Sequence, residues 1–422
     1  MGLIDRQILR RLESHIKGGS LLLTVGGRPH RFGNGKPEVQ WVMDHPGTLR
    51  RISRDPEMAL GETYMAGQWR TQRGSLSDLL ELLLRSFPET HPQGLQRPVA
   101  GLSKLLHQWN RVARSRRNVA HHYDLDESLF REFLDRDMHY SCAYFPHPGM
   151  PLEQAQQHKC RHIMAKLRIQ PNQRVLDIGS GWGGLALFLA EQAGARVTGL
   201  TLSREQLRVA QQRADARGLQ GQVQFRLEDY RSHRGSYDRI VSVGMFEHVG
   251  QPQYGTFFGQ VAKLLTDDGI ALLHTIGRRG PPGTTNPWIR KYIFPGGYNP
   301  AASEVLRAIE HSGLAAVDLE VLRLHYAWTV AAWQQRFQAR RSAIAARMGE
   351  QFCRMWEFYL AASEAAFRCG DLVVFQFQLS PWGAAIPVTR NYLYRAGFIG
   401  EPDAEQPAQP QTAGHSGVTT AA

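Results

Sequence analysis

Short apolar runs alternate with helix-length segments through the middle of this 422-residue chain. The runs fall at residues 174–180, 196–202, 223–229, 237–244 and 269–277, and one more follows at 371–380. Strands that alternate with helices predict an α/β domain built on a parallel, doubly wound sheet. We expect the late run at 371–380 to add an edge strand to this sheet.

The first hundred residues follow a different pattern. The stretch 20–35 reads as a hairpin with glycine-rich turns, and residues 39–45 read as a further strand. Residues 75–87 form an amphipathic pattern that begins with a serine, as a capped helix does. These signals predict a small α+β domain over residues 1–100.

Composition divides the rest of the chain. Residues 101–120 form a basic connector with arginines at 111, 114, 116 and 117, and residues 121–400 hold the α/β pattern. The tail at 401–422 is rich in Pro, Gln and Ala and is predicted to be disordered. A chain of this length suits two domains.

Net charge and cysteine content limit the classes of partner and site that the chain can have. The net charge of +12 and the pI of about 9.8 favour polyanions, either nucleic acid or an anionic bilayer, and charge alone does not choose between them. No CxxC pair occurs, so the sequence indicates no disulfide framework and no metal site. No window is long and apolar enough to span a membrane, and the N-terminus lacks the features of a signal peptide. We therefore expect a cytoplasmic protein.

A glycine loop at residues 175–190, "VLDIGSGWGGLALFLA", carries the first chemical signal. Gly179, Gly181 and Gly184 satisfy GxGxxG, a pattern that dinucleotide enzymes share with methyltransferases. A nicotinamide enzyme would place an acidic residue after the second strand, but here that strand ends "GLTLS" with no carboxylate before Glu205. Together with Asp177 inside the first strand, this favours S-adenosylmethionine as the ligand.

Six motifs then occur in one order: "HYSCAYF" (139–145), "VLDIGSGWGG" (175–184), "GLTLSREQ" (199–206), "GMFEHVG" (244–250), "LLHTIG" (272–277) and "HYAWTVAAWQQRF" (325–337). Together they resemble the cyclopropane-fatty-acyl-phospholipid synthase family, which includes the mycolic acid cyclopropane synthases, over about residues 118–380. The segment 60–69, "LGETYMAGQW", resembles the N-terminal domain of the phospholipid-acting members. The resemblance implies a Rossmann-like, class I S-adenosylmethionine-dependent methyltransferase fold.

The same resemblance implies an activity. A methyl(ene) group would pass from S-adenosylmethionine to the cis double bond of an acyl chain in a membrane phospholipid, and a bound bicarbonate would deprotonate the resulting carbocation as the cyclopropane ring closes. The alternative is a relative that ends in methyl-branched or methylene fatty acids. The implied partners are an anionic phospholipid surface at the inner face of the cell membrane and a second copy of the chain, and no nucleic acid.

Carried over by position, the family's bicarbonate ligands are Cys142, Glu247, His274, Ile276 through its backbone, and Tyr326. The family's donor-binding positions are Tyr140, Ser141, Asp177, Gly179, Gly181, Trp182, Gly183, Thr201, Leu202, Ser203, Gln206, Asp229 and Tyr230. Two positions depart from the family's usual pattern. Ser363 stands where many members have a cysteine, and Trp328 stands where a smaller or basic residue is usual.

The chemistry is consistent with these residue types. Attack by an alkene leaves a carbocation, so the site must be dry and lined by aromatic faces or a fixed anion. Glu247 and His274 follow strand ends that meet at one edge of the sheet. Taken singly, each residue has an alternative: Glu247 as a helix-start carboxylate, His274 as a core histidine, Tyr326 as a buried aromatic. A nucleic-acid methyltransferase would usually carry an Asn/Asp-Pro-Pro-aromatic motif where this chain reads "GMFEHVG".

Overall fold

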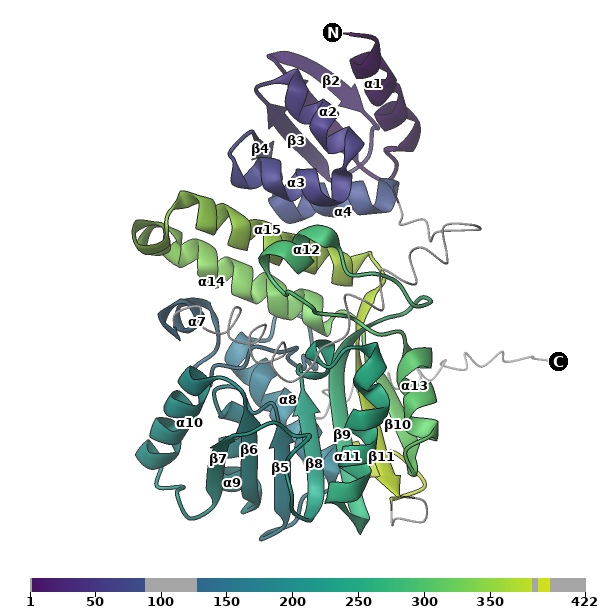
Figure 1. Ribbon diagram of the computed structural model, residues 1–422. Coiled ribbons are helices and arrows are strands. Elements are labelled where there is room, and N and C mark those ends of the chain that lie inside the picture. The colour runs from purple at the N-terminus through teal and green to yellow at the C-terminus, as the bar shows by residue number, and fades with distance from the viewer. Residues whose placement is uncertain (1, 88–126, 382–385, 395–422) are drawn as a thin grey trace, which may run out of the picture.

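The computed structural model describes residues 2–87, 127–381 and 386–394. The predicted basic connector at 101–120 and the predicted disordered tail at 401–422 lie outside the described residues. Figure 1 shows a small N-terminal domain at one end of the molecule and a larger sheet domain at the other. A pair of long helices, α14 and α15, lies between them.

The N-terminal domain is a four-stranded sheet of order β2-β1-β3-β4 with helices packed around it. Its elements are α1 (Leu3–His15), β1 (Ser20–Val25), β2 (Arg28–Phe32), β3 (Glu38–Met43), α2 (Pro46–Arg54), α3 (Pro56–Met65), β4 (Trp69–Arg73) and α4 (Leu76–Ser86). The predicted hairpin is confirmed, since Gly26 and Gly27 have φ of 54° and 77°, the positive values that a two-residue type I′ turn needs. The predicted cap of α4 is also confirmed, because Ser75 Oγ accepts a hydrogen bond from Asp78 N at 3.0 Å.

The large domain contains a seven-stranded sheet of order β10-β11-β9-β8-β5-β6-β7. Its strands are β5 (Arg174–Ile178), β6 (Arg196–Thr201), β7 (Val223–Leu227), β8 (Tyr237–Val243), β9 (Leu265–Arg278), β10 (Leu314–Leu322) and β11 (Leu372–Pro381). Strands β5 to β9 pair in parallel and β11 runs antiparallel to both of its neighbours. The predicted doubly wound α/β fold is therefore confirmed.

The edge-strand prediction for 371–380 is wrong. Strand β11 lies inside the sheet between β9 and β10, and β10, which the sequence pattern did not reveal, forms the edge. Both faces of β11 are covered, so even Gln376 and Gln378 are fully buried. These two glutamines gave the run the alternating polarity of a half-exposed strand.

Helices cover both faces of the sheet (Figure 1). One face carries α8 (Leu152–Leu167), α9 (Gly184–Ala193) and α10 (Arg204–Ala216), and the other carries α11 (Tyr254–Leu264) and α13 (Ala302–Glu310). Successive side chains of β5 point to opposite faces of the sheet. Val175 packs into the core beneath α8 to α10, and Leu176 packs into the core beneath α11 and α13. Short helices complete the domain: η1 (Phe246–His248), η2 (Gln251–Gln253) and α16 (Asn391–Tyr394).

A helical layer joins the two domains. It consists of α7 (Glu127–Phe133), α12 (Pro287–Tyr292), α14 (His325–Met348) and α15 (Glu350–Arg368). Helices α3 and α4 of the N-terminal domain pack on α15, and α3 also packs on α12. Polar contacts cross the same boundary: Ser77 Oγ donates to Glu364 Oε2 at 2.7 Å, and Lys291 Nζ lies 2.8 Å from Glu62 Oε1. A single hydrophobic core therefore runs from the small sheet into the helical layer.

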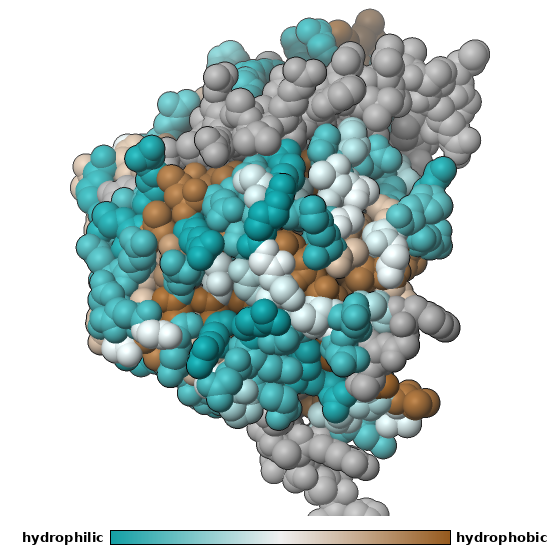
Figure 2. Space-filling view, turned by 60° about the horizontal axis from the view of Figure 1, so that its bottom comes forward, coloured by the Kyte–Doolittle hydropathy of each residue, from teal (hydrophilic) through white to brown (hydrophobic). Residues whose placement is uncertain are grey.

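The surface is mostly polar on the side seen in Figure 2, where hydrophobic residues form smaller areas between hydrophilic ones. The large hydrophobic side chains that are most exposed among the described residues are Leu3, Ile4, Leu227, Val317, Val321, Val388 and Tyr394. None of the helices in the described part of the chain is long and apolar enough to cross a membrane.

Docking of the N-terminal domain depends on close approach at Gly61 of α3. A Cβ at this position would lie 2.4 Å from Nε1 of Trp288, a fully buried side chain of α12. We expect Gly61→Ala to lower the free energy of unfolding by about 1–3 kcal/mol, because the rigid indole ring must shift. Denaturant unfolding followed by tryptophan fluorescence measures this change.

The matched control is Gly47→Ala in α2. Gly47 is also helical, but it is exposed and a Cβ there meets nothing within 4 Å. Its replacement should leave stability unchanged or raise it by up to about 1 kcal/mol through helix propensity. Equal effects of the two substitutions would contradict the packing argument.

Candidate functional site

A cavity opens where the carboxyl ends of β5, β6 and β8 meet. Its lining comprises residues 138–141, 159, 177–182, 184–185, 200–202, 206, 228–231, 243–245 and 248–249. We call it the glycine-loop cavity. Open α/β sheets bind their ligands at this edge, where the strand order reverses about the first strand of the fold.

The glycine loop between β5 and α9 forms the floor of the cavity. Gly179 has φ of 87°, and a Cβ there would lie 2.7 Å from Cβ of Met245, so only glycine suits both the backbone and the space. Gly183 has φ of 83° and is the N-cap residue of α9. The loop thus brings its backbone and the start of a helix against whatever the cavity holds.

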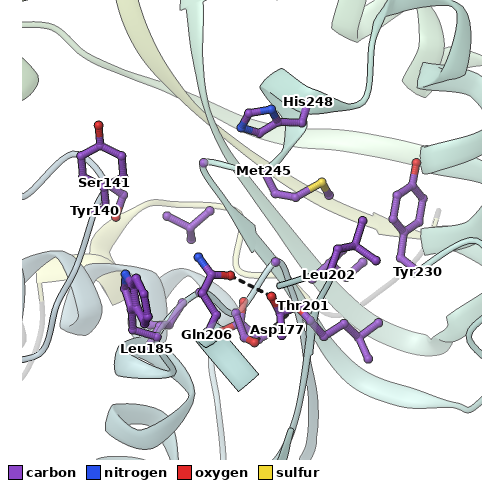
Figure 3. Close-up of a pocket in the computed structure, with 18 of the residues that line it drawn as sticks. Tyr140, Ser141, Asp177, Leu185, Thr201, Leu202, Gln206, Tyr230, Met245 and His248 are labelled. Carbon is purple, nitrogen blue, oxygen red and sulfur yellow. Dashed lines mark hydrogen bonds between the residues drawn. The ribbon is translucent and has the colours of Figure 1, made fainter. Parts of the chain in front are cut away.

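The end of β6 forms a second wall. Thr201 Oγ1 donates to Gln206 Oε1 at 2.8 Å and accepts from Ser203 N at 3.1 Å, while Ser203 Oγ accepts from Gln206 N and caps α10 (Figure 3). Because these bonds hold Thr201 and Gln206 in place, the wall is fixed without a ligand. Asp229 is held similarly by Arg231, whose Nη2 lies 2.7 Å from Asp229 Oδ2.

Figure 3 shows Asp177 beside Thr201 and Gln206, and Tyr140 on the side of the cavity away from Tyr230. Asp177 is 2% exposed, and burial raises its pKa to about 7 although Lys159 and His139 oppose the rise. The Tyr140 hydroxyl lies 2.8 Å from that of Tyr359 on α15, and its ring stacks on Trp333 of α14. The helical layer therefore covers the cavity on this side.

Most of the predicted donor-binding residues line this cavity. They are Tyr140, Ser141, Asp177, Gly179, Gly181, Trp182, Thr201, Leu202, Gln206, Asp229 and Tyr230. Gly183 and Ser203 are not part of the lining. They cap α9 and α10 and so shape the loops that line it.

None of the five predicted anion ligands belongs to the lining, but the structure brings two of them together. Glu247 lies in η1, and its Oε1 accepts a hydrogen bond from the backbone N of Ile276 at 2.6 Å. The Ile276 N–H is therefore engaged by this carboxyl group. Burial raises the pKa of Glu247 to about 7.

Of the other three, Cys142 and His274 neighbour residues of the lining, and Tyr326 packs in the helical layer. Cys142 follows Ser141 of the lining, and burial raises the pKa of its thiol. His274 pairs across the sheet with Val243 of the lining; burial lowers its pKa to about 3, and its Nδ1 lies 3.1 Å from Gln376 Nε2. Tyr326, on α14, packs on Phe367.

Sequence reasoning missed several residues of the lining, chiefly His139, Lys159, Met245 and His248. Met245 and His248 flank Glu247, so the motif "GMFEHVG" held the signal for both. Lys159 had no such signal, since a lysine in the helical stretch 152–167 reads as a solvent-exposed position. In the structure it is 1% exposed.

Three further positions have clear places. Trp288 does not face the cavity but packs between α3 and Phe358 of α15. Trp328, on α14, packs edge-on against Phe145. Ser363 lies half-buried on α15.

Comparison with known proteins decides the family. The family model described as mycolic acid cyclopropane synthetase matches residues 110–377. The chain belongs to the cyclopropane synthase family of S-adenosylmethionine-dependent methyltransferases. The resemblance seen in the sequence and the class I methyltransferase fold are both confirmed.

Two relatives of the cyclopropane synthase family match most of this chain. The cyclopropane-fatty-acyl-phospholipid synthase of Escherichia coli strain K12 is 38% identical over 351 residues, which cover 82% of this chain and 89% of that protein. The tuberculostearic acid methyltransferase UfaA1 of Mycobacterium tuberculosis is 38% identical over 394 residues, covering 89% and 90%.

Among solved structures, the mycolic acid cyclopropane synthase CmaA1, complexed with SAH and CTAB, is similar with a TM-score of 0.59. It is 34% identical, and the match covers 63% of this chain and 97% of that one. Coclaurine N-methyltransferase, at 20% identity and a TM-score of 0.63, shares the fold.

We expect Asp177 to make donor binding pH-dependent, because its carboxyl group lines the glycine-loop cavity. Only the ionised carboxylate attracts the donor's ammonium group, and its pKa is about 7. We expect the affinity for S-adenosylhomocysteine to rise about tenfold per pH unit below that pKa and to level off above it. Isothermal titration calorimetry across this range measures the profile.

Asp177→Asn is the control for this profile. The variant should bind more weakly at neutral pH and lose the tenfold slope. A slope that survives in Asp177→Asn would assign the titration to a group other than Asp177.

Proposed function

We propose that this protein transfers a methylene group from S-adenosylmethionine to the cis double bond of an unsaturated acyl chain in a membrane phospholipid, and so forms a cyclopropane fatty acid. The observation that carries the proposal is the position of the Glu247–Ile276 pair directly behind the glycine-loop cavity. One wall thus joins a methyl-donor cavity to a buried acid–base group.

The cavity's chemistry supports S-adenosylmethionine as the donor. Asp177 offers a carboxylate for the donor's ammonium, and the Thr201–Gln206 and Asp229 walls offer polar groups for its ribose and base. The relative CmaA1 is described in complex with SAH, the demethylated donor. The predicted donor-binding residues serve these roles in our proposal.

The surroundings of Tyr140 suit a carbocation. The ring of Tyr140 stacks on Trp333 and lies edge-on to Phe130 and Phe133, with Trp356 packed on both phenylalanines. Aromatic faces stabilise a cation without supplying a nucleophile that would trap it. The same packing excludes water, which would otherwise add to the cation.

Ring closure requires removal of a proton from the transferred group. His274, Tyr326 and Glu247 carry a ring N–H, a hydroxyl and a protonatable carboxyl group, which suit a small oxyanion such as bicarbonate. Cys142 Sγ donates to Ala143 O at 3.3 Å and Ile276 N donates to Glu247, so these two donors would have to exchange those bonds to reach the anion. His274, with its pKa near 3, stays neutral and keeps one ring N–H, and Glu247, with its pKa near 7, offers or accepts a proton. A bound bicarbonate would supply the base. Glu247 and His274 would hold it and set its orientation.

The extent of similarity supports a phospholipid as the substrate. The match to the E. coli phospholipid enzyme covers 82% of this chain, whereas the match to CmaA1 covers 63%. The small N-terminal domain, which docks on α12 and α15 through Glu62 and Glu364, accounts for the difference. We therefore propose a phospholipid substrate reached from an anionic bilayer surface at the inner face of the cell membrane, and a homodimer as the working form.

The second candidate is a fatty acyl methyltransferase that gives a methyl-branched or methylene product. UfaA1, named as a methyltransferase of tuberculostearic acid, is as similar in identity as the E. coli synthase. Both reactions share the same carbocation: loss of a proton with ring closure gives the cyclopropane, and loss of a proton with formation of an alkene gives the methylene product. A saturated methyl branch would need a further two-electron reductant, such as a reduced nicotinamide. The buried Glu247–Ile276 pair favours ring closure because it provides a fixed place for a base.

Incubation of the purified protein with S-adenosylmethionine and vesicles of a cis-unsaturated anionic phospholipid tests the function. We expect fatty acids heavier by one CH₂ unit in mass spectrometry and the upfield proton resonances of a cyclopropane ring in NMR. An olefinic methylene signal at the same mass would establish the second candidate. No heavier product, with S-adenosylhomocysteine binding verified by calorimetry, would overturn both.

Glu247→Gln tests the acid–base role. The variant should lose activity by about 100-fold or more, because the amide cannot exchange a proton. Its affinity for S-adenosylhomocysteine should stay the same, since Glu247 does not line the glycine-loop cavity. Steady-state kinetics and calorimetry measure the two effects.

Glu364→Gln is the matched control, because Glu364 is as buried as Glu247 at 7% exposure but lies on the far side of α15. It should keep most of its activity. Equal losses in the two variants, or a loss of donor affinity in Glu247→Gln, would contradict the assigned role.

A further inference from the structure

Helix α8 places the positive charge of Lys159 in the lining of the glycine-loop cavity, which the sequence did not predict. Lys159 is 1% exposed and belongs to the cavity lining beside Ser141 and Asp177. The helix reaches this place because Gln156, one turn earlier, donates from Nε2 to the backbone O of Ser141 at 3.0 Å. Lys159 is thus held at the end of the cavity where Asp177 lies.

The ammonium group of Lys159 is only partly satisfied. Its Nζ donates one hydrogen bond, to Ser141 Oγ at 3.2 Å, and no carboxylate oxygen in the described part of the chain lies within ion-pair distance. An ammonium carries three donors, and a buried charge is costly unless it is paired. Asp177 interacts with it electrostatically over a longer distance.

A second buried lysine on the same helix, Lys166, differs from Lys159 because it has an ion-pair partner. Lys166 lies two turns further along α8 on the same face and is equally buried at 1% exposure. Its Nζ lies 2.6 Å from Oε2 of Glu320, which also receives His162 Nε2 at 2.6 Å. Lys166 therefore has a protein counter-ion, and it is not part of the cavity lining.

We infer that Lys159 binds the carboxylate of the methyl donor's amino-acid end, while Asp177 binds its ammonium group. The inference rests on the proposed use of S-adenosylmethionine. The donor's amino-acid end carries one group of each sign, and Lys159 and Asp177, which interact electrostatically, present the complementary pair in the cavity lining. Ser141 completes the arrangement, since its hydroxyl accepts from Lys159 and keeps its own hydrogen to donate.

Calorimetry with two ligands tests the inference. The probes are S-adenosylhomocysteine and its decarboxylated analogue, which differs only in lacking the carboxylate. We expect the wild-type protein to prefer S-adenosylhomocysteine by about 10- to 100-fold, the range for a hydrogen bond to a charged group. Lys159→Met should remove this preference, because a change in the ionisation of Asp177 alters the affinity for both ligands alike and leaves their ratio unaffected.

Lys166→Met is the matched control. It removes an equally buried ammonium from the same helix face, so any general effect on α8 appears in both variants. Lys166→Met should lose stability and keep the ligand preference. A preference that persists in Lys159→Met, or that disappears equally in Lys166→Met, would overturn the inference.

A crystal structure of the wild-type protein with S-adenosylhomocysteine gives an answer even where a variant does not fold. Lys159 Nζ should lie within hydrogen-bonding distance of a ligand carboxylate oxygen, and a carboxylate turned away from it would overturn the inference. Failure of the wild-type protein to bind S-adenosylhomocysteine at all would instead count against the proposed methyl donor. The two failures are therefore distinguishable.

Discussion

Exclusion of water from the carboxyl edge of the seven-stranded sheet is the constraint on which the rest of the structure depends. Helices α14 and α15 lie over this edge, with Tyr140 packed against Trp333 and hydrogen-bonded to Tyr359. The outer face of α15 would in turn be left apolar, and the N-terminal domain covers it through α3 and α4. The small domain thus contributes to the site without lining it, since it holds in place the helices that keep the site dry.

Much of this architecture could be predicted from the sequence. The glycine loop, the five parallel strands and the small domain all follow from local patterns, because apolar runs and turn residues report on their own surroundings. The sheet's far edge could not be predicted. Strand β10 has apolar side chains in solvent and acidic ones towards the protein. Val317 and Val321 are 42% exposed, while Asp318 and Glu320 face Lys166 of α8. Only the tertiary pairing makes this pattern stable.

Some residues of the candidate site could likewise be predicted from the sequence, and others could not. Residues on the glycine loop and at the end of β6 could be placed because their motifs define both the local backbone and the side-chain direction. Lys159 could not be, since helical spacing alone does not distinguish a lysine on a buried face from one in solvent. Its role depends on α8 lying against residues 139–141, a contact made by Gln156 across 15 residues of sequence. Long-range packing, and not composition, turns this lysine into a candidate ligand-binding residue.

Burial also explains how one site can be stable before the donor binds and yet favour a cation later. Asp177 and Glu247 both have pKa values of about 7, so near neutral pH neither carries a full charge at all times. This lowers the cost of placing two carboxyl groups in a dry interior. A nearby sulfonium or carbocation favours the ionised form of each, because an opposite charge at short range lowers a carboxyl pKa. The negative charge of the site therefore increases when positive charge enters it, and the permanently buried ammonium of Lys159 keeps Asp177 closer to ionisation than burial alone would allow.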